Sequence, residues 1–250
     1  IRLSKKLNNN IYLKREDLQL TRSFKIRGSF NKMLLQNDKN INQKEFVCAS
    51  AGNHAQGFAY SCNLLNLKGN IFIPNTTPLQ KIERIKYYGK DNIELKIIGN
   101  NFYECLQESL EFSKFNNFIH IHPYDDLDII DGQSTICKEI IEQVDNKIDI
   151  ISCCVGGGGL ISGMVEYNNK NNCNIKIIGG EPENANSLYL SLKNNIPTKI
   201  ENLDTFVDGA SVSQVGENNF NILKNNLSFN DIFVISNGRI CNELLNMYGE

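Results

Sequence analysis

The stretch IDIISCCVGGGGLISGMV at residues 148–165 of this 250-residue chain is the part of the sequence that decides the fold. Residues 148–155 form an apolar, isoleucine-rich run that is typical of a buried strand. Residues 160–165 read as a buried helix, and the four glycines of residues 156–159 join the two elements. A flexible linker would carry serine, threonine or charges around its glycines, so this stretch predicts a strand, a tight glycine loop and a helix.

The four-glycine loop predicts an anion site. Glycines let backbone N–H groups approach a ligand closely, and the start of a helix adds unpaired donors and the positive end of the helix dipole. A phosphate fits best. The dinucleotide pattern G-x-G-x-x-G fails because Ser162 stands at its third position, and the P-loop pattern fails because Met164, not lysine, follows Gly163. A simple packing turn remains the alternative from this loop alone.

Short apolar runs alternate with longer amphipathic segments along the whole chain. The expected strands are residues 46–49, 70–73, 93–98, 118–121, 148–155, 175–178 and 232–235. The expected helices are residues 53–65, 77–88, 101–114, 132–144 and 160–168, with a further helix from 28 to 35. Such alternation predicts an α/β protein with mostly parallel sheets flanked by helices, and any second lobe should be interleaved. Asparagine clusters between these segments are expected in loops and turns.

Composition excludes several classes of protein. The formal charge of -2 and pI near 6.0 give no basic field, so no nucleic-acid partner is expected. No apolar run approaches the length of a membrane helix. The eight cysteines show no C-x-x-C spacing and are expected to be reduced thiols. His120 and His122 lack other ligands at zinc spacing, so no metal site is expected.

Two further motifs carry chemistry. SFKIRG at residues 23–28 contains Lys25, and SAGNHAQG at residues 50–57 follows a predicted strand. A lone lysine at a helix start is usually a solvated residue, and Asn53 could simply cap the helix that follows it. The short residues of the second motif also expose backbone donors that suit a carboxylate.

Together these motifs resemble the threonine/serine dehydratase family, whose members use pyridoxal phosphate on the tryptophan-synthase-β type of fold. The similarity covers nearly the whole chain: the quoted motifs, residues 11–17, Gly132–Gln133, Glu181–Pro182 and residues 208–212. The resemblance implies two interleaved lobes. Residues 1–19 and 127–250 would form a large cofactor domain, and residues 20–126 a small domain carrying the asparagine loop.

The resemblance also assigns roles to residues. Lys25 would form the Schiff base with the cofactor aldehyde, which only an amine can do reversibly, and would act as general base. Phe24 would pack beside the cofactor ring, Asn53 would bond its 3-hydroxyl, and Gly209 would lie near it. The phosphate would be held by Gly156, Gly157, Gly158, Gly159 and Leu160. The substrate carboxylate would be held by the amides around Ser50, Ala51, Gly52, Asn53 and His54.

The implied activity is dehydration and deamination of L-threonine to 2-oxobutanoate, and of L-serine to pyruvate, with release of ammonia. Such an enzyme belongs to isoleucine biosynthesis. Serine racemases of the same family are an alternative, but they carry a second hydroxyl residue where this chain has Ala51 and an aspartate where it has Ser187. A non-catalytic remnant that binds the cofactor is a further alternative.

Some features of the family lie beyond the sequence. The family places a Ser or Cys opposite the pyridine nitrogen in a late Ser-Gly-rich motif, which would follow the helix expected at residues 237–248. We therefore expect the C-terminal part of the large domain to be missing from this chain. The family also implies a homo-oligomer. The cysteines, expected to be reduced thiols, favour a location in the cytoplasm or in an organellar matrix.

Overall fold

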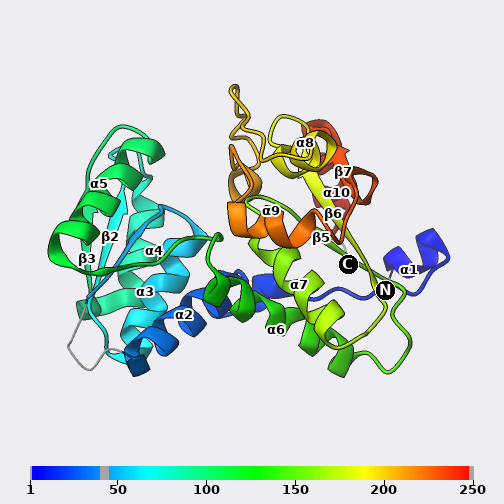
Figure 1. Ribbon diagram of the computed structural model, residues 1–250, viewed down its shortest axis with the longest axis horizontal. Coiled ribbons are helices and arrows are strands. Elements are labelled where there is room, and N and C mark those ends of the chain that lie inside the picture. Colours follow the sequence, from blue (N-terminus) through cyan, green and yellow to red (C-terminus); the bar gives the residue numbers. More distant parts are fainter. Residues whose placement is uncertain (1, 40–44, 248–250) are drawn as a thin grey trace. The chain divides into compact units, whose positions relative to one another are not determined.

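The computed structural model describes residues 2–39 and 45–247, and these residues form two units (Figure 1). One unit contains residues 16–136, and the other contains residues 1–15 together with 137–250. The chain therefore leaves one unit and returns to it. The domain boundaries predicted from the sequence, after residues 19 and 126, stay a prediction.

The unit of residues 16–136 contains a four-stranded parallel sheet in the order β3-β2-β1-β4. Its strands are β1 (Phe46–Ala49), β2 (Gly69–Ile73), β3 (Ile93–Ile97) and β4 (Ile119–His120). Its helices are α2 (Lys25–Lys39), α3 (Asn53–Leu65), α4 (Leu79–Gly89) and α5 (Phe102–Asn116), with short 3₁₀ turns at Glu16–Leu18 and Lys90–Asn92. Helix α6 (Leu127–Gln143) begins in this unit and ends in the other.

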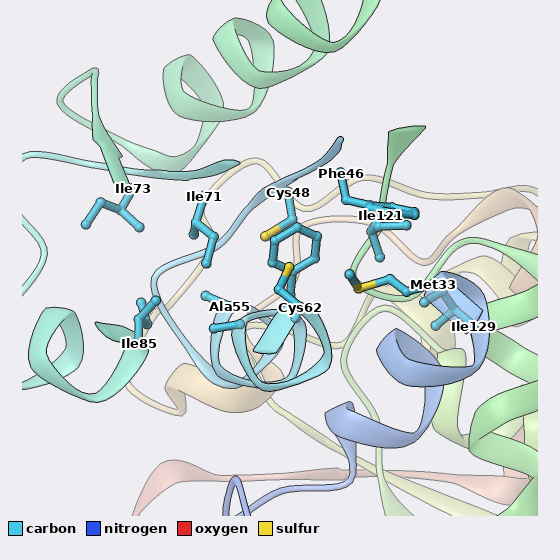
Figure 2. Close-up of a cluster of buried hydrophobic side chains, with 12 residues drawn as sticks. Met33, Phe46, Cys48, Ala55, Cys62, Ile71, Ile73, Ile85, Ile121 and Ile129 are labelled. Carbon is cyan, nitrogen blue, oxygen red and sulfur yellow. The ribbon is translucent and has the colours of Figure 1, made fainter. Parts of the chain in front are cut away.

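Alternation along β1 explains why both faces of this sheet are covered. Phe46 and Cys48 point to a core shared with α2, α3 and α4, which Figure 2 shows as a layer of side chains between strands and helices. Val47 and Ala49 point to the opposite face and pack with Cys105 of α5. Because successive residues of a strand face opposite sides, a strand that is apolar at every position must be buried on both.

The other unit contains a three-stranded parallel sheet in the order β5-β6-β7. Its strands are β5 (Ile150–Cys154), β6 (Lys176–Pro182) and β7 (Ile232–Ile235). Its helices are α1 (Arg2–Leu7), α7 (Gly159–Lys170), α8 (Ser187–Asn194), α9 (Glu217–Leu223) and α10 (Asn237–Met247), with 3₁₀ turns at Asp208–Ala210 and Phe229–Asp231. The predicted α/β class with parallel sheets is confirmed.

Several predicted boundaries were wrong by a few residues. The strand expected at 118–121 has only two residues, the strand expected at 148–155 spans 150–154, and α6 begins five residues before the expected 132. The helix expected from residue 28 begins at Lys25. Helices α1, α8 and α9 were not expected. The last residue of the helix predicted at 237–248, Tyr248, lies outside the described residues.

Asparagine ends several of these elements, as its composition predicted. Asn66, Asn117 and Asn195 are the C-cap residues of α3, α5 and α8, all in left-handed backbone conformation. Asparagine tolerates this region because its short polar side chain offsets part of the steric cost. Some asparagines of the cluster at 168–172 instead lie inside α7. Within residues 2–39 and 45–247, no helix is long and apolar enough to cross a membrane.

Candidate active site

Lys25 is the first residue of α2, and its ammonium group is held by a backbone carbonyl. The Lys25 Nζ donates to the carbonyl oxygen of Pro123 at 2.7 Å. It also lies 5.5 Å from the ring centroid of Phe24 and 5.9 Å from that of Tyr124, within the range of cation–π attraction. The side chain is partly buried. These contacts distinguish Lys25 from the solvated surface lysine that is the common alternative at a helix start.

The turn that presents the Pro123 carbonyl is organised by His122. The Nδ1 of His122 accepts from the backbone N–H groups of Asp125 at 2.7 Å and Tyr124 at 3.3 Å. Backbone N–H groups can only donate, so Nδ1 carries the lone pair and the ring hydrogen is on Nε2. Burial lowers the pKa of His122, against the opposing charge of Asp125, which favours this neutral form. Sequence reasoning considered His122 only as a metal ligand and missed this role.

Asn53 is the first residue of α3 and does not cap it. The N-cap is Gly52, whose N–H donates to the Oγ of Ser50 at 3.1 Å. The Asn53 side chain is exposed, so the alternative prediction that this asparagine is a capping residue is wrong. Ser50, Ala51 and Gly52 are partly buried in the loop between β1 and α3. The exposed side-chain amide of Asn53, next to Gly52, is a group that can bind a ligand.

The imidazole of His54 belongs to the core. Its Nε2 lies 3.0 Å from the carbonyl oxygen of Ile121, so Nε2 donates, and its Nδ1 lies 3.4 Å from the hydroxyl of Ser29. Burial, followed by the charge of Lys25, lowers the pKa of His54 to about 3. The ring is therefore neutral, and both of its nitrogens have hydrogen-bond partners within the protein. Any contact of His54 with a substrate carboxylate is limited to its backbone amide.

Glycines bring the lysine and asparagine motifs together. A Cβ on Gly57 would lie 2.9 Å from the backbone nitrogen of Ile26, so α3 approaches the start of α2 only because residue 57 has no side chain. Gly28 and Gly132 meet in the same way where α2 crosses α6, since a Cβ on Gly132 would lie 2.7 Å from the Gly28 Cα. The motif glycines therefore position Lys25 by close packing.

The four-glycine loop joins β5 to α7 in the other unit. Gly158 is the N-cap of α7 and has φ +95°, a conformation that favours glycine. Gly157, Gly158, Gly159 and Leu160 are buried, and Gly156 is partly buried. The first N–H groups of α7 have no acceptor within the helix. The loop therefore offers donors and the positive end of a helix dipole, as the sequence predicted.

Two neighbouring segments shape the loop. The carbonyl of Gly157 accepts from the backbone N–H of Gly216 and from the side-chain amide of Asn219, both at 3.1 Å. A Cβ on Gly156 would lie 3.3 Å from the Cα of Ala210, so the turn Asp208–Ala210, which contains the exposed Gly209, lies beside the loop. Asn219 was missed by sequence reasoning, because an asparagine in an asparagine-rich chain carries no distinguishing signal.

The residues present fit pyridoxal phosphate. The aldehyde needs a primary amine, which Lys25 supplies, and the phosphate needs several convergent donors, which the loop supplies. A side chain at Gly158 would be strained in backbone and would meet Asn219, so only glycine lets this loop pack against α9 in this conformation. Among the described residues, no group of three or more His, Cys, Asp or Glu side chains could hold a metal ion.

This lysine, this glycine loop and these parallel sheets define a class of enzyme that binds pyridoxal phosphate. Residues 1–249 match the family model described as pyridoxal-phosphate dependent enzyme, and the chain belongs to this family. Its cofactor is pyridoxal phosphate.

Among characterised relatives, the chain is 43% identical to the biosynthetic L-threonine dehydratase IlvA of Halalkalibacterium halodurans over 248 residues. The match covers 99% of this chain and 59% of the relative. The chain is thus similar to about three-fifths of such a protein. The corresponding dehydratase of Staphylococcus epidermidis is 44% identical over 252 residues, again 99% of this chain and 59% of the relative.

Solved structures agree on the fold. The processed threonine deaminase isoform 2 from Solanum lycopersicum has a TM-score of 0.87 at 38% identity, covering 94% of this chain and 67% of that one. Maize serine racemase has a TM-score of 0.87 at 26% identity, covering 96% and 71%. The predicted tryptophan-synthase-β type of pyridoxal-phosphate fold is confirmed.

Proposed function

We propose that this chain carries the catalytic part of an L-threonine dehydratase that uses pyridoxal phosphate. The reaction converts L-threonine into 2-oxobutanoate and ammonia, and L-serine into pyruvate and ammonia. The observation that carries the proposal is the placement of Lys25, whose amine is partly buried, oriented by the Pro123 carbonyl and flanked by two aromatic rings. The names of the relatives support the choice of threonine as substrate.

Lys25 would bind the cofactor aldehyde, Phe24 would lie beside the ring, and Asn53 would donate to the ring hydroxyl. The phosphate would be bound by the amides of residues 156–160, and Gly209 would leave room for the ring because it has no side chain. An exposed Asn53 amide and an open position at Gly209 support these roles.

When bound, the cofactor withdraws the electrons of the bond to the substrate Cα hydrogen. Lys25 would take that proton on Nζ once the substrate amine has displaced it and would pass it to the β-hydroxyl, which would leave as water. Hydrolysis of the released enamine by water would then give the 2-oxo acid and ammonia. The backbone amides of the loop Ser50–His54 would hold the substrate carboxylate. The carbonyl of Pro123 would stabilise the ammonium form of Lys25, because a charged donor makes the stronger hydrogen bond.

Racemisation is less well supported than elimination. A racemase needs a proton donor on the face of the substrate opposite the lysine, and the residue at the position of the racemase hydroxyl is Ala51, which has none. Likeness to maize serine racemase at 26% identity does not supply that group.

Product analysis tests the proposal. Purified protein loaded with pyridoxal phosphate is incubated with L-threonine or L-serine; the 2-oxo acids are trapped as hydrazones, and serine enantiomers are separated by chiral chromatography. We expect 2-oxobutanoate from threonine, and none from Lys25→Ala. Formation of D-serine without oxo acid would make the chain a racemase, whereas no product with cofactor bound would make it a non-catalytic binding protein.

The proposal includes a place for the enzyme in the cell. A biosynthetic threonine dehydratase supplies the 2-oxobutanoate used to make isoleucine, and we place it in the cytoplasm or an organellar matrix as a homo-oligomer. Light scattering after gel filtration tests the oligomer: a single monomeric mass at micromolar concentration would contradict it.

A further inference from the structure

We propose that His122 is a positioning residue that holds the Pro123 carbonyl as the docking point of the Lys25 amine whenever that amine is not bonded to the cofactor. This inference rests on the proposed role of Lys25 as the lysine that carries pyridoxal phosphate. It goes beyond that role because it gives the turn at residues 122–125 a function: the turn holds the lysine amine while the amine is not bonded to the cofactor.

A series of contacts connects His122 to the Lys25 amine. His122 fixes the turn through two backbone N–H groups, and the turn fixes the carbonyl of Pro123 at 2.7 Å from the Lys25 Nζ. The His122 ring packs edge-on against Tyr124, with centroids 4.7 Å apart, and the Tyr124 ring lies 5.9 Å from the same Nζ. Proline restricts φ at the residue that presents the carbonyl. Each link therefore limits where the amine can lie.

The proposed chemistry needs such a docking point. Lysine has four rotatable side-chain bonds, so an amine released by the substrate would otherwise spread over many rotamers. An amine held at one carbonyl starts each return to the cofactor carbon from the same position, close to the geometry in which the bond forms. Only the carbonyl oxygen is required, so no side chain at residue 123 reveals the function.

The identity of residue 122 decides whether the turn forms. Nδ1 of histidine accepts two N–H groups, and asparagine places its Oδ1 at nearly the same position, since both atoms are three bonds from Cα. Glutamine is closer to histidine in size but places its oxygen one bond further out. His122→Asn should therefore keep the turn, and His122→Gln should lose it. His120→Asn is a matched control, because His120 lies two residues earlier and contacts Ser109 instead.

The experiment measures how fast the lysine bonds the cofactor. Cofactor is removed from the purified protein and its variants, pyridoxal phosphate is added back, and the visible absorption band of the lysine-bound cofactor is followed by stopped flow. We expect His122→Gln to form the band about tenfold more slowly. We expect His122→Asn and His120→Asn to remain within roughly threefold of the unmodified protein. Circular dichroism and melting temperature verify folding.

The outcomes separate positioning from general packing. An unchanged rate in folded His122→Gln overturns the proposal, and so does an equal loss in His122→Asn or His120→Asn. If His122→Gln does not fold, Pro123→Ala decides: it keeps the carbonyl but frees φ, and an unchanged rate there overturns the proposal. The measurement contains no amino-acid substrate. A protein that binds the cofactor through Lys25 but makes no 2-oxobutanoate therefore disproves the proposed function alone.

Discussion

The side-chain amide of Asn219 donates to the carbonyl oxygen of Gly157 at 3.1 Å, across 62 positions of the chain. Asn219 is fully buried in α9. The Gly157 carbonyl also accepts from the N–H of Gly216, the residue before α9. The peptide group between Gly157 and Gly158 is therefore held by two donors. The loop is thus shaped by a helix that sequence analysis did not predict.

Asn219→Leu should weaken cofactor binding. Leucine has the same number and branching of side-chain heavy atoms but no donor, and the loss of a neutral hydrogen bond costs about 1 kcal/mol, which corresponds to roughly fivefold in Kd. Asn219→Asp should be worse, because a buried carboxylate would face the Gly157 carbonyl, which cannot donate to it. Titration with pyridoxal phosphate measures both. Asn221→Ala, on the exposed side of α9, is the control; equal losses in all three variants would contradict the role of Asn219.

Gly158→Ala should strain the loop. The added Cβ would sit at a residue with φ +95° and would lie 3.0 Å from the Cβ of Asn219 and 3.1 Å from a methyl of Val215. We expect a loss of about 1–3 kcal/mol in the free energy of unfolding and weaker binding of the cofactor. Gly238→Ala is the control, because no atom lies within 4 Å of its Cβ position. Urea unfolding checks both, and similar values for the two variants would show that the loop tolerates a side chain.

Glu181 should make stability depend on pH. Its buried carboxylate accepts from the N–H groups of Leu188 and Tyr189, and burial raises its pKa to about 7 from an ordinary 4.5. Between these two values the folded protein binds more protons than the unfolded chain. The contribution to stability is therefore fully present below 4.5 and is lost as pH rises through about 7, by at most about 3 kcal/mol.

The variant Glu181→Gln isolates this effect. Unfolding free energies of both proteins are measured across the same pH range and subtracted. The subtraction cancels the contribution of the buried histidines. Their lowered pKa values make stability rise with pH below their ordinary pKa of 6.5, which is the opposite trend. We expect the difference between the variant and the unmodified protein to change in favour of Glu181→Gln as pH rises. A difference that does not vary with pH would mean that Glu181 titrates at its ordinary value in the folded protein.

Arg27→Lys should be costly although it conserves charge. The guanidinium donates to both oxygens of Glu16 at 2.8 and 2.9 Å and to the hydroxyl of Thr135 at 3.0 Å. Lysine cannot reproduce this planar fork, so we expect a loss of about 1–3 kcal/mol, measured by urea unfolding. The exposed pair Lys138–Glu142 offers the contrast: Lys138→Ala should cost less than about 0.5 kcal/mol. Equal losses in the free energy of unfolding would show that the Arg27 contacts stabilise the fold no more than an exposed ion pair does.

Local signals were enough to predict much of the molecule. The bounds of β1, β7 and α3 were predicted to the residue, because strong periodicity coincides with clear start and stop signals there. Helices α8 and α9 were missed, since they are short and are held by tertiary contacts that local propensity does not reveal. The candidate residues themselves were found through motifs, and their roles remain proposals.

The sequence by itself determined the alternation of strands and helices, the glycine loop and the position of Lys25, because each depends on neighbouring residues. Only the tertiary structure decided what holds these parts. Pro123 binds the lysine amine through a backbone carbonyl, which every residue possesses, and Gly57, Gly28 and Gly132 act through the absence of a side chain. A group common to all residues leaves no trace in residue identity until folding brings its partner to it.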